Sequence, residues 1–141
     1  MALDKHFLKK SLTLPKSGET VCYDVISNTS NDEFKMDIDR SSSIELSTKC
    51  KLQNRYVAER IPLVRIDIDS PPHMNPDGTK LSRNHIHIYR EAGHIPGKLP
   101  WACELTEVME NYDPETSTFM DVFNWFCDYC HIMHDGIQGV L

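Results

Sequence analysis

The sequence predicts an α+β fold, with one antiparallel sheet of about five strands and C-terminal helices covering one of its faces. Two observations predict this fold class. Apolar and polar residues alternate through most of residues 20–91, as in strands that bury one face. After residue 102 the apolar spacing changes to three and four, which is typical of helices. A chain of 141 residues is expected to form a single domain over residues 1–141.

Five stretches carry the strand pattern, and residues that favour turns separate most of them. The stretches are residues 20–27, 33–40, 44–52, 61–69 and 84–90. Short connections between alternating segments favour antiparallel neighbours, so residues 20–91 are assigned to the sheet. One face should be apolar and buried, and the opposite face should be polar and open to solvent.

The helical cover is expected within residues 102–136. Asp113, Pro114 and Glu115 form a helix-start pattern of a capping residue, a proline and an acid in the first turn. Gly136 is a predicted stop, and a shorter helix is expected around residues 103–111. The apolar residues that recur at helical spacing are Phe119, Val122, Phe123, Phe126, Cys130 and Met133.

Composition narrows the class of protein. The formal charge of −6 argues against a protein that wraps a long stretch of nucleic acid, because such binding depends on many Lys and Arg contacts to phosphate. No apolar run approaches the roughly 20 residues of a membrane span, and the first residues lack the apolar core of a signal peptide. The five cysteines are scattered and odd in number, as expected of reduced thiols. We therefore expect a cytoplasmic protein without a membrane partner.

The strongest candidate site is the histidine pair that follows the loop over residues 70–84. In a strand, His85, His87 and Tyr89 lie on one face because side chains alternate with a period of two. If residues 61–69 form the neighbouring strand, further polar side chains join this face or reach it from the loop. They are Arg65, Asp67, Asp69, His73, Asn75, Asp77, Lys80 and Arg83.

Three interpretations of this cluster remain open. In the first, His85, His87, His73 and Tyr89 are the catalytic residues of a metal-independent ribonuclease that uses general acid and base catalysis. The phosphate or substrate contacts would then be Arg65, Lys80, Arg83 and Asn75. In the second, the histidine pair holds zinc or a non-haem metal together with His73 or Asp67. In the third, the histidines are only polar surface. The strand pair has no evident closed ligand set, so we expect no bound metal and no cofactor.

Two segments carry a resemblance to a known family. Residues 61–78, which end in Pro-Pro-His-Met-Asn-Pro-Asp-Gly, and the following His-Ile-His-Ile-Tyr resemble an uncharacterised domain-of-unknown-function family of short bacterial and phage-associated proteins. The resemblance covers about residues 34–91. It implies a microbial or mobile-element source and carries no established activity. Its motif positions here are His73, Asn75, Asp77, His85, His87 and Tyr89.

The sequence therefore supports two functions of different kinds. The first is a toxin-like ribonuclease with RNA as its partner. The second is a non-catalytic, anti-CRISPR-like inhibitor that occupies the basic groove of a host defence nuclease or another basic protein. The inhibitor would act through acids such as Asp37, Asp39, Asp67 and Asp69. Net charge favours the inhibitor, and the loop motif favours the enzyme.

Overall fold

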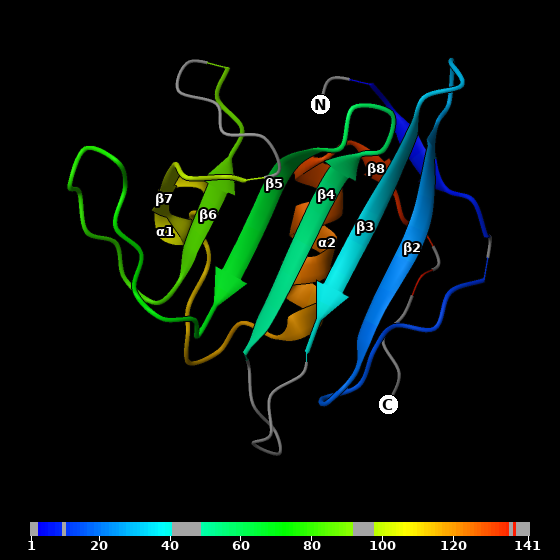
Figure 1. Ribbon diagram of the computed structural model, residues 1–141. Coiled ribbons are helices and arrows are strands. Elements are labelled where there is room, and N and C mark those ends of the chain that lie inside the picture. Colours follow the sequence, from blue (N-terminus) through cyan, green and yellow to red (C-terminus); the bar gives the residue numbers. More distant parts are fainter. Residues whose placement is uncertain (1–2, 10, 41–48, 92–97, 136, 138–141) are drawn as a thin grey trace.

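The protein is built on one mixed sheet of eight strands (Figure 1). The computed structural model describes residues 3–9, 11–40, 49–91, 98–135 and 137, so the predicted strand over residues 44–52 lies partly outside it. The spatial order is β7-β6-β5-β4-β3-β2-β1-β8, and only the β1–β8 pair is parallel. The strands are β1 (Lys5–Phe7), β2 (Thr20–Ser27), β3 (Glu33–Asp39), β4 (Cys50–Tyr56), β5 (Ile61–Ile68), β6 (His85–Ile88), β7 (Ala102–Glu104) and β8 (Ile132–Met133).

The predicted fold class is wrong in strand number, sheet type and helix content. Eight strands replace the expected five, and the sheet is mixed and not antiparallel throughout. The described part of residues 102–136 holds two short helices, α1 (Leu105–Val108) and α2 (Phe119–Tyr129), and also contributes β7 and β8. Strands of two or three residues are too short to show an alternating pattern, so β1, β7 and β8 could not be predicted from apolar spacing. In the described part of the chain, neither helix has the length and apolar character that crossing a membrane requires.

Helix α2 begins later than its predicted start at Asp113. Thr118 caps it, because its hydroxyl accepts the Asp121 N–H while the Asp121 carboxylate accepts the Thr118 N–H. The residues after Asp113 form a separate turn in which the Ser117 N–H donates to the Asp113 carbonyl. The helix ends at Tyr129, so Met133 belongs to β8, and the predicted stop at Gly136 lies outside the described residues.

The hydrophobic core lies between α2 and one face of the sheet, the face turned away from the viewer in Figure 1. Phe123 and Phe126 are fully buried, and the Phe123 ring stacks on Phe7 of β1 with 6.3 Å between the ring centroids. The inward residues of the strands complete this core, among them Met36, Ile38, Leu52, Ile66 and Ile86.

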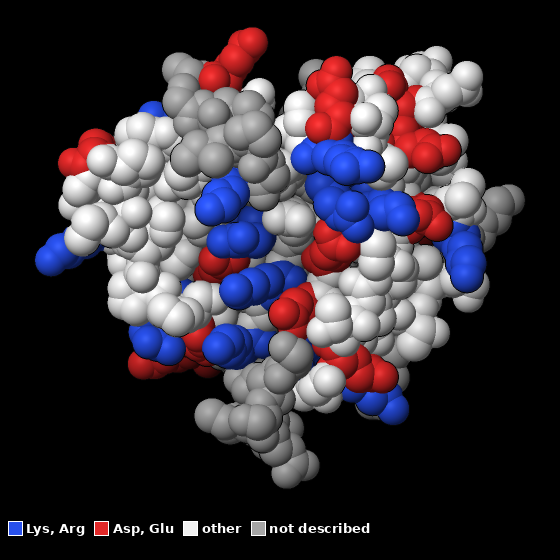
Figure 2. Space-filling model, in the orientation of Figure 1, with Lys and Arg blue, Asp and Glu red and all other residues white. Residues whose placement is uncertain are grey.

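The opposite face of the sheet carries charges of both signs side by side (Figure 2). On this face, Lys35 of β3 lies 3.7 Å from the Asp24 carboxylate of β2. Arg55 of β4 donates to the Asp37 carboxylate across the β3–β4 pair, with 2.7 Å between nitrogen and oxygen. Cross-strand pairs of opposite charge thus neutralise much of this surface.

Candidate functional site

The pairing of β5 with β6 brings the predicted site residues together. Its register sets Arg65 opposite His87 and Asp67 opposite His85. Because side chains alternate along a strand, all four lie on the face turned away from α2, while Ile66 and its neighbours enter the core. The alternating pattern therefore predicted that Arg65, Asp67, His85 and His87 share one face.

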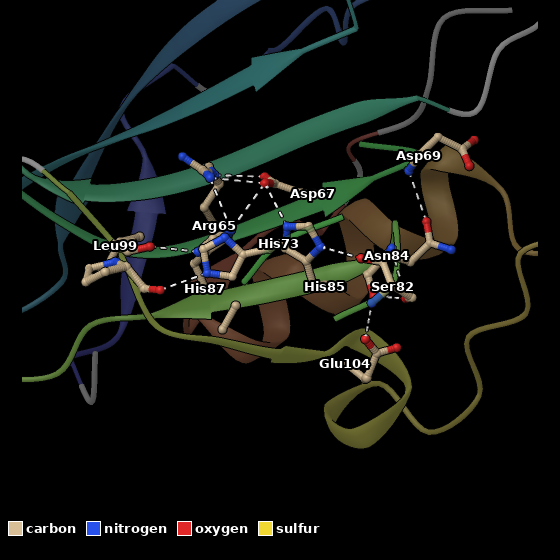
Figure 3. A network of polar contacts seen from close by, with 12 residues as sticks. Arg65, Asp67, Asp69, His73, Ser82, Asn84, His85, His87, Leu99 and Glu104 are labelled. Carbon is tan, nitrogen blue, oxygen red and sulfur yellow. Dashed lines mark hydrogen bonds and ion pairs between the residues drawn. The ribbon is translucent and has the colours of Figure 1, made fainter. Parts of the chain in front are cut away.

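The prediction that this part of the sheet is open to solvent is wrong. The exposed fraction is 1% for His85, 2% for His87 and 3% for Asp67. The loop between β5 and β6 folds back over the strands and places the His73 ring 5.5 Å from the His85 ring and 4.6 Å from the His87 ring, measured between centroids (Figure 3). The buried Leu99 covers the same cluster from the segment before β7.

Both strand histidines have the same hydrogen-bonding arrangement. The Nδ1–H of His85 donates to the Ser82 carbonyl at 2.9 Å, and the Nδ1–H of His87 donates to the Leu99 carbonyl at 2.7 Å. A carbonyl oxygen only accepts, so each Nδ1 carries the proton. Each Nε2 then faces the Oδ2 atom of Asp67, at 3.2 Å from His85 and 3.3 Å from His87.

Arg65 supplies a positive charge to the same carboxylate. Its Nε donates to Oδ1 of Asp67 at 2.8 Å, and its Nη2 donates to Oδ2 at 3.0 Å. The Nη2 atom also lies 3.2 Å from Nε2 of His87. The guanidinium and the two imidazoles therefore converge on one buried carboxylate.

The environment shifts the three titrating groups in different directions. Burial acts to raise the pKa of Asp67, but its contacts with His85, His87 and Arg65 outweigh burial and hold the pKa well below its usual range. Burial acts to lower the pKa of His85, but its contacts with Asp67 and the Ser82 carbonyl raise it overall. Burial is the main cause of the lowered pKa of His87. His87 is thus the more readily neutral ring, and its Nε2 lone pair accepts from Arg65.

The loop motif mainly shapes the cover over the histidines. Asn75 is buried, and its amide makes two hydrogen bonds to the main chain of Ala102 in β7, at 2.8 and 2.9 Å. Gly78 has φ of +90°, a backbone conformation that glycine adopts without strain, and the Asp77 carboxylate accepts the Thr79 N–H. These contacts fix the loop against β7 and commit the Asn75 amide, which was expected to bind substrate, to the protein itself.

The other predicted site residues lie around this cluster. In the described part of the chain, no hydrogen bond or ion pair joins Lys80 or Arg83 to the three histidines. Both side chains are exposed, and Arg83 donates to the Asp69 carbonyl. Asp69 follows β5 with φ of +53°, and its N–H donates to the Asn84 side chain. Tyr89 lies half-buried, one residue past the end of β6.

The four acids expected to bind a basic partner do not form an open acidic patch. Asp67 is buried under the loop, and Asp37 is engaged by Arg55. Asp39 accepts a hydrogen bond from Thr20 at 3.1 Å. The sequence pattern did not show that Arg55 of the neighbouring strand would pair with Asp37, or that the loop would bury Asp67.

An acidic surface lies instead in the C-terminal part of the chain. All 15 Lys and Arg fall within residues 1–100 together with 13 of the 21 acids, so residues 101–141 carry eight acids and neither Lys nor Arg. Lys35, Arg55 and Arg65 pair with Asp24, Asp37 and Asp67, which all precede residue 101. A count of charge by segment would have found this asymmetry. The exposed members are Glu107, Glu110, Asp113, Glu115, Asp121, Asp128 and Asp135.

A hollow of about 510 Å³ opens among these acids beside α2. The carboxylates of Glu110, Asp121 and Asp128 line it together with the indole of Trp125. Trp125 is half-buried and stacks on Tyr129 at 4.9 Å between centroids, which fixes its ring. Carboxylates beside an aromatic ring are the chemistry that recognises a lysine or arginine side chain.

Comparison with known proteins gives a family and no activity. The model of a family of unknown function, DUF6978, matches residues 1–132. No protein with a curated description and no solved structure matches the chain.

Proposed function

We propose a function from the geometry of this chain. The chain belongs to DUF6978, a family of unknown function, so its family membership assigns no activity. In this proposal it is a non-catalytic binding protein that captures a basic protein through the acidic hollow beside α2. The finer form of the proposal is that the chain comes from a phage or mobile element. Its partner is then a host defence nuclease whose nucleic-acid groove it occupies in the manner of an anti-CRISPR protein.

The observation that carries this proposal is that acids unaccompanied by Lys or Arg in residues 101–141 line a hollow beside α2. Glu110, Asp121 and Asp128 surround a cavity large enough for an arginine or lysine side chain, and Trp125 offers a ring for a cation–π contact. With no Lys or Arg in residues 101–141, the surface around the hollow attracts basic partners over several ångströms. A protein that binds nucleic acid is a suitable basic partner, because it presents Lys and Arg to the phosphates.

A metal-independent ribonuclease is the competing proposal. The convergence of His73, His85 and His87 supports it, since general acid and base catalysis needs clustered imidazoles. It also needs a ring nitrogen that reaches the substrate. Both nitrogens of His85 and of His87 already have partners within the protein, and both rings are buried. The geometry therefore favours the binding protein.

The binding proposal is tested with a fluorescent oligo-arginine peptide, whose anisotropy reports binding. The double variant Glu110→Gln with Asp128→Asn should weaken binding about 5- to 10-fold, as expected for the loss of two exposed ion pairs. Trp125→Leu should weaken it further without changing the net charge. The matched control, Glu33→Gln with Glu59→Gln, removes two exposed acids elsewhere and should bind like the wild type.

Equal weakening in the control pair would show that net charge alone governs binding and would contradict the proposal.

The finer form is tested by crosslinking the wild type and the Glu110/Asp128 variant in a microbial host. A nuclease should be enriched with the wild type and lost with the variant. Incubation of the wild type with single-stranded and structured RNA in chelator, from acid to alkaline pH, should give no cleavage. Cleavage that is lost in His73→Ala would favour the ribonuclease instead.

A further inference from the structure

The buried histidine cluster has the geometry of a metal-ligand set. One ligand atom each from Asp67, His85 and His87 lies within 4.8 Å of the other two. Zinc binds imidazole nitrogen and carboxylate oxygen at about 2.0–2.2 Å in a tetrahedron, which places neighbouring ligand atoms about 3.3–3.5 Å apart. The two distances from Oδ2 of Asp67 to the imidazole Nε2 atoms are 3.2 and 3.3 Å. Charge-assisted N–H···O bonds are shorter, at about 2.7–2.9 Å.

The hydrogen bonds around the two rings give a second and independent indication. Histidines that ligate metals almost always donate their other N–H to a carbonyl or carboxylate, which fixes the ring and its tautomer. His85 and His87 both do so through Nδ1, to the carbonyls of Ser82 and Leu99. Two adjacent rings are thus held with their Nε2 atoms turned to the same point beside Asp67 (Figure 3).

We infer that Asp67, His85 and His87 bind a divalent transition-metal ion of the zinc class. Two imidazoles and one carboxylate suit Zn²⁺, Co²⁺ and Fe²⁺ better than Mg²⁺ or Ca²⁺, which prefer oxygen ligands. Three protein ligands leave a fourth position open. The His73 ring packs against both histidines, and its Nε2–H donates to the Pro100 carbonyl at 2.8 Å, so the loop over residues 70–84 closes that side of the site.

This inference does not depend on the proposed function, because the acidic hollow lies beside α2 and shares no residue with the site. The test titrates the purified, metal-stripped full chain with Co²⁺ and follows its visible ligand-field absorption, which distinguishes tetrahedral from octahedral Co²⁺. We expect one ion per chain in a tetrahedral nitrogen and oxygen environment, displaced by Zn²⁺. Elemental analysis of the Zn²⁺-loaded chain should give the same stoichiometry.

Asp67→Asn and His87→Gln should each weaken Co²⁺ binding by about 100-fold or more, beyond what loss of an outer partner costs. The control is His131→Asn with His134→Asn, two histidines elsewhere that each face one carboxylate, and it should bind like the wild type. Circular dichroism checks that each variant is folded. The wild-type spectrum decides the matter if the buried variants unfold. An octahedral spectrum, no 1:1 binding, or binding lost only in the control pair would overturn the inference.

Discussion

Arg65 contacts two of the atoms that would bind the metal ion, so its guanidinium and the ion compete for them. Its Nη2 atom lies 3.0 Å from Oδ2 of Asp67 and 3.2 Å from Nε2 of His87, two of the atoms that would ligate the ion. The guanidinium therefore competes with a cation for the same lone pairs. Its Nε contact with Oδ1 can persist when the ion is bound.

Replacing Arg65 with Gln should therefore strengthen Zn²⁺ binding, by about 10-fold if one charge-assisted contact is removed from the competition. Competition against a chromophoric chelator measures the change. Arg55→Gln, which breaks the ion pair with Asp37 on the same face of the sheet, is the matched control and should leave the affinity unchanged. Weaker binding in Arg65→Gln would mean that the guanidinium supports the site.

Burial also reverses the expected effect of removing a strand histidine. A histidine on an open sheet face is replaced at a cost within about 0.5 kcal/mol, but His87 is 2% exposed and has partners at both ring nitrogens. His87→Ala should lower the free energy of unfolding of the metal-free chain by about 1–3 kcal/mol, because it leaves buried partners unsatisfied. Urea denaturation measures this loss, with the exposed His131→Ala as the control.

At the scale of elements, alternation identified β2, β3, β5 and β6 but missed the short strands. It also ended one strand at residue 52, although β4 extends to Tyr56. Strand β2 has the predicted bounds, and β5 differs from its predicted range by one residue. The helix-start pattern at Asp113 was misleading because Thr118 and Asp121 form a complete capping box five residues later. The cover over the histidines could not be read from the sequence, because it depends on the loop and Leu99 meeting over β6.

Helix α2 should be essential to the fold in spite of its short length. Phe123 and Phe126 are fully buried between it and the sheet. Replacing either with Ala should cost roughly 3–5 kcal/mol of unfolding free energy, through lost burial and the cavity left behind. Leu8→Ala, at a leucine that is 60% exposed, is the control in the same denaturation experiment. A loss below about 1 kcal/mol at both phenylalanines would contradict this packing.

The Arg55–Asp37 pair links β3 to β4 and should respond to acid. Burial acts to raise the pKa of Asp37, but hydrogen bonds from Arg55 and Cys22 lower it overall. A carboxyl group with a lowered folded pKa stabilises the fold above its unfolded pKa, and this stability is lost as the pH falls through the folded pKa. Asp37→Asn should therefore cost about 0.5–1 kcal/mol at neutral pH, because the pair is partly exposed. The difference from wild type in denaturation midpoints should vanish below the usual range of an aspartate pKa.

At the scale of the whole molecule, the buried histidine cluster and the acidic hollow lie in different parts of the structure. The histidine cluster lies at the β5–β6 pair, on the sheet face turned away from α2, whereas the acidic hollow lies beside α2. Binding of the oligo-arginine peptide should weaken steeply with added salt, since exposed charges are screened over about 8–10 Å at physiological ionic strength. Zn²⁺ binding at the buried site should change much less in the same titration. Equal salt dependence of the two would contradict their separation.

The parallel pair of β1 and β8 sets the order in which the sheet can be completed. Strands β2 to β6 each bond to the next strand in the chain, so these contacts are local and quick to form. The Lys5 N–H, in contrast, donates to the His131 carbonyl, a contact that spans almost the whole sequence. During synthesis on a ribosome, β1 cannot pair with β8 until residue 132 has been synthesised. In pulsed hydrogen exchange during refolding, the Lys5 amide should therefore gain protection after the amides of β3 and β4.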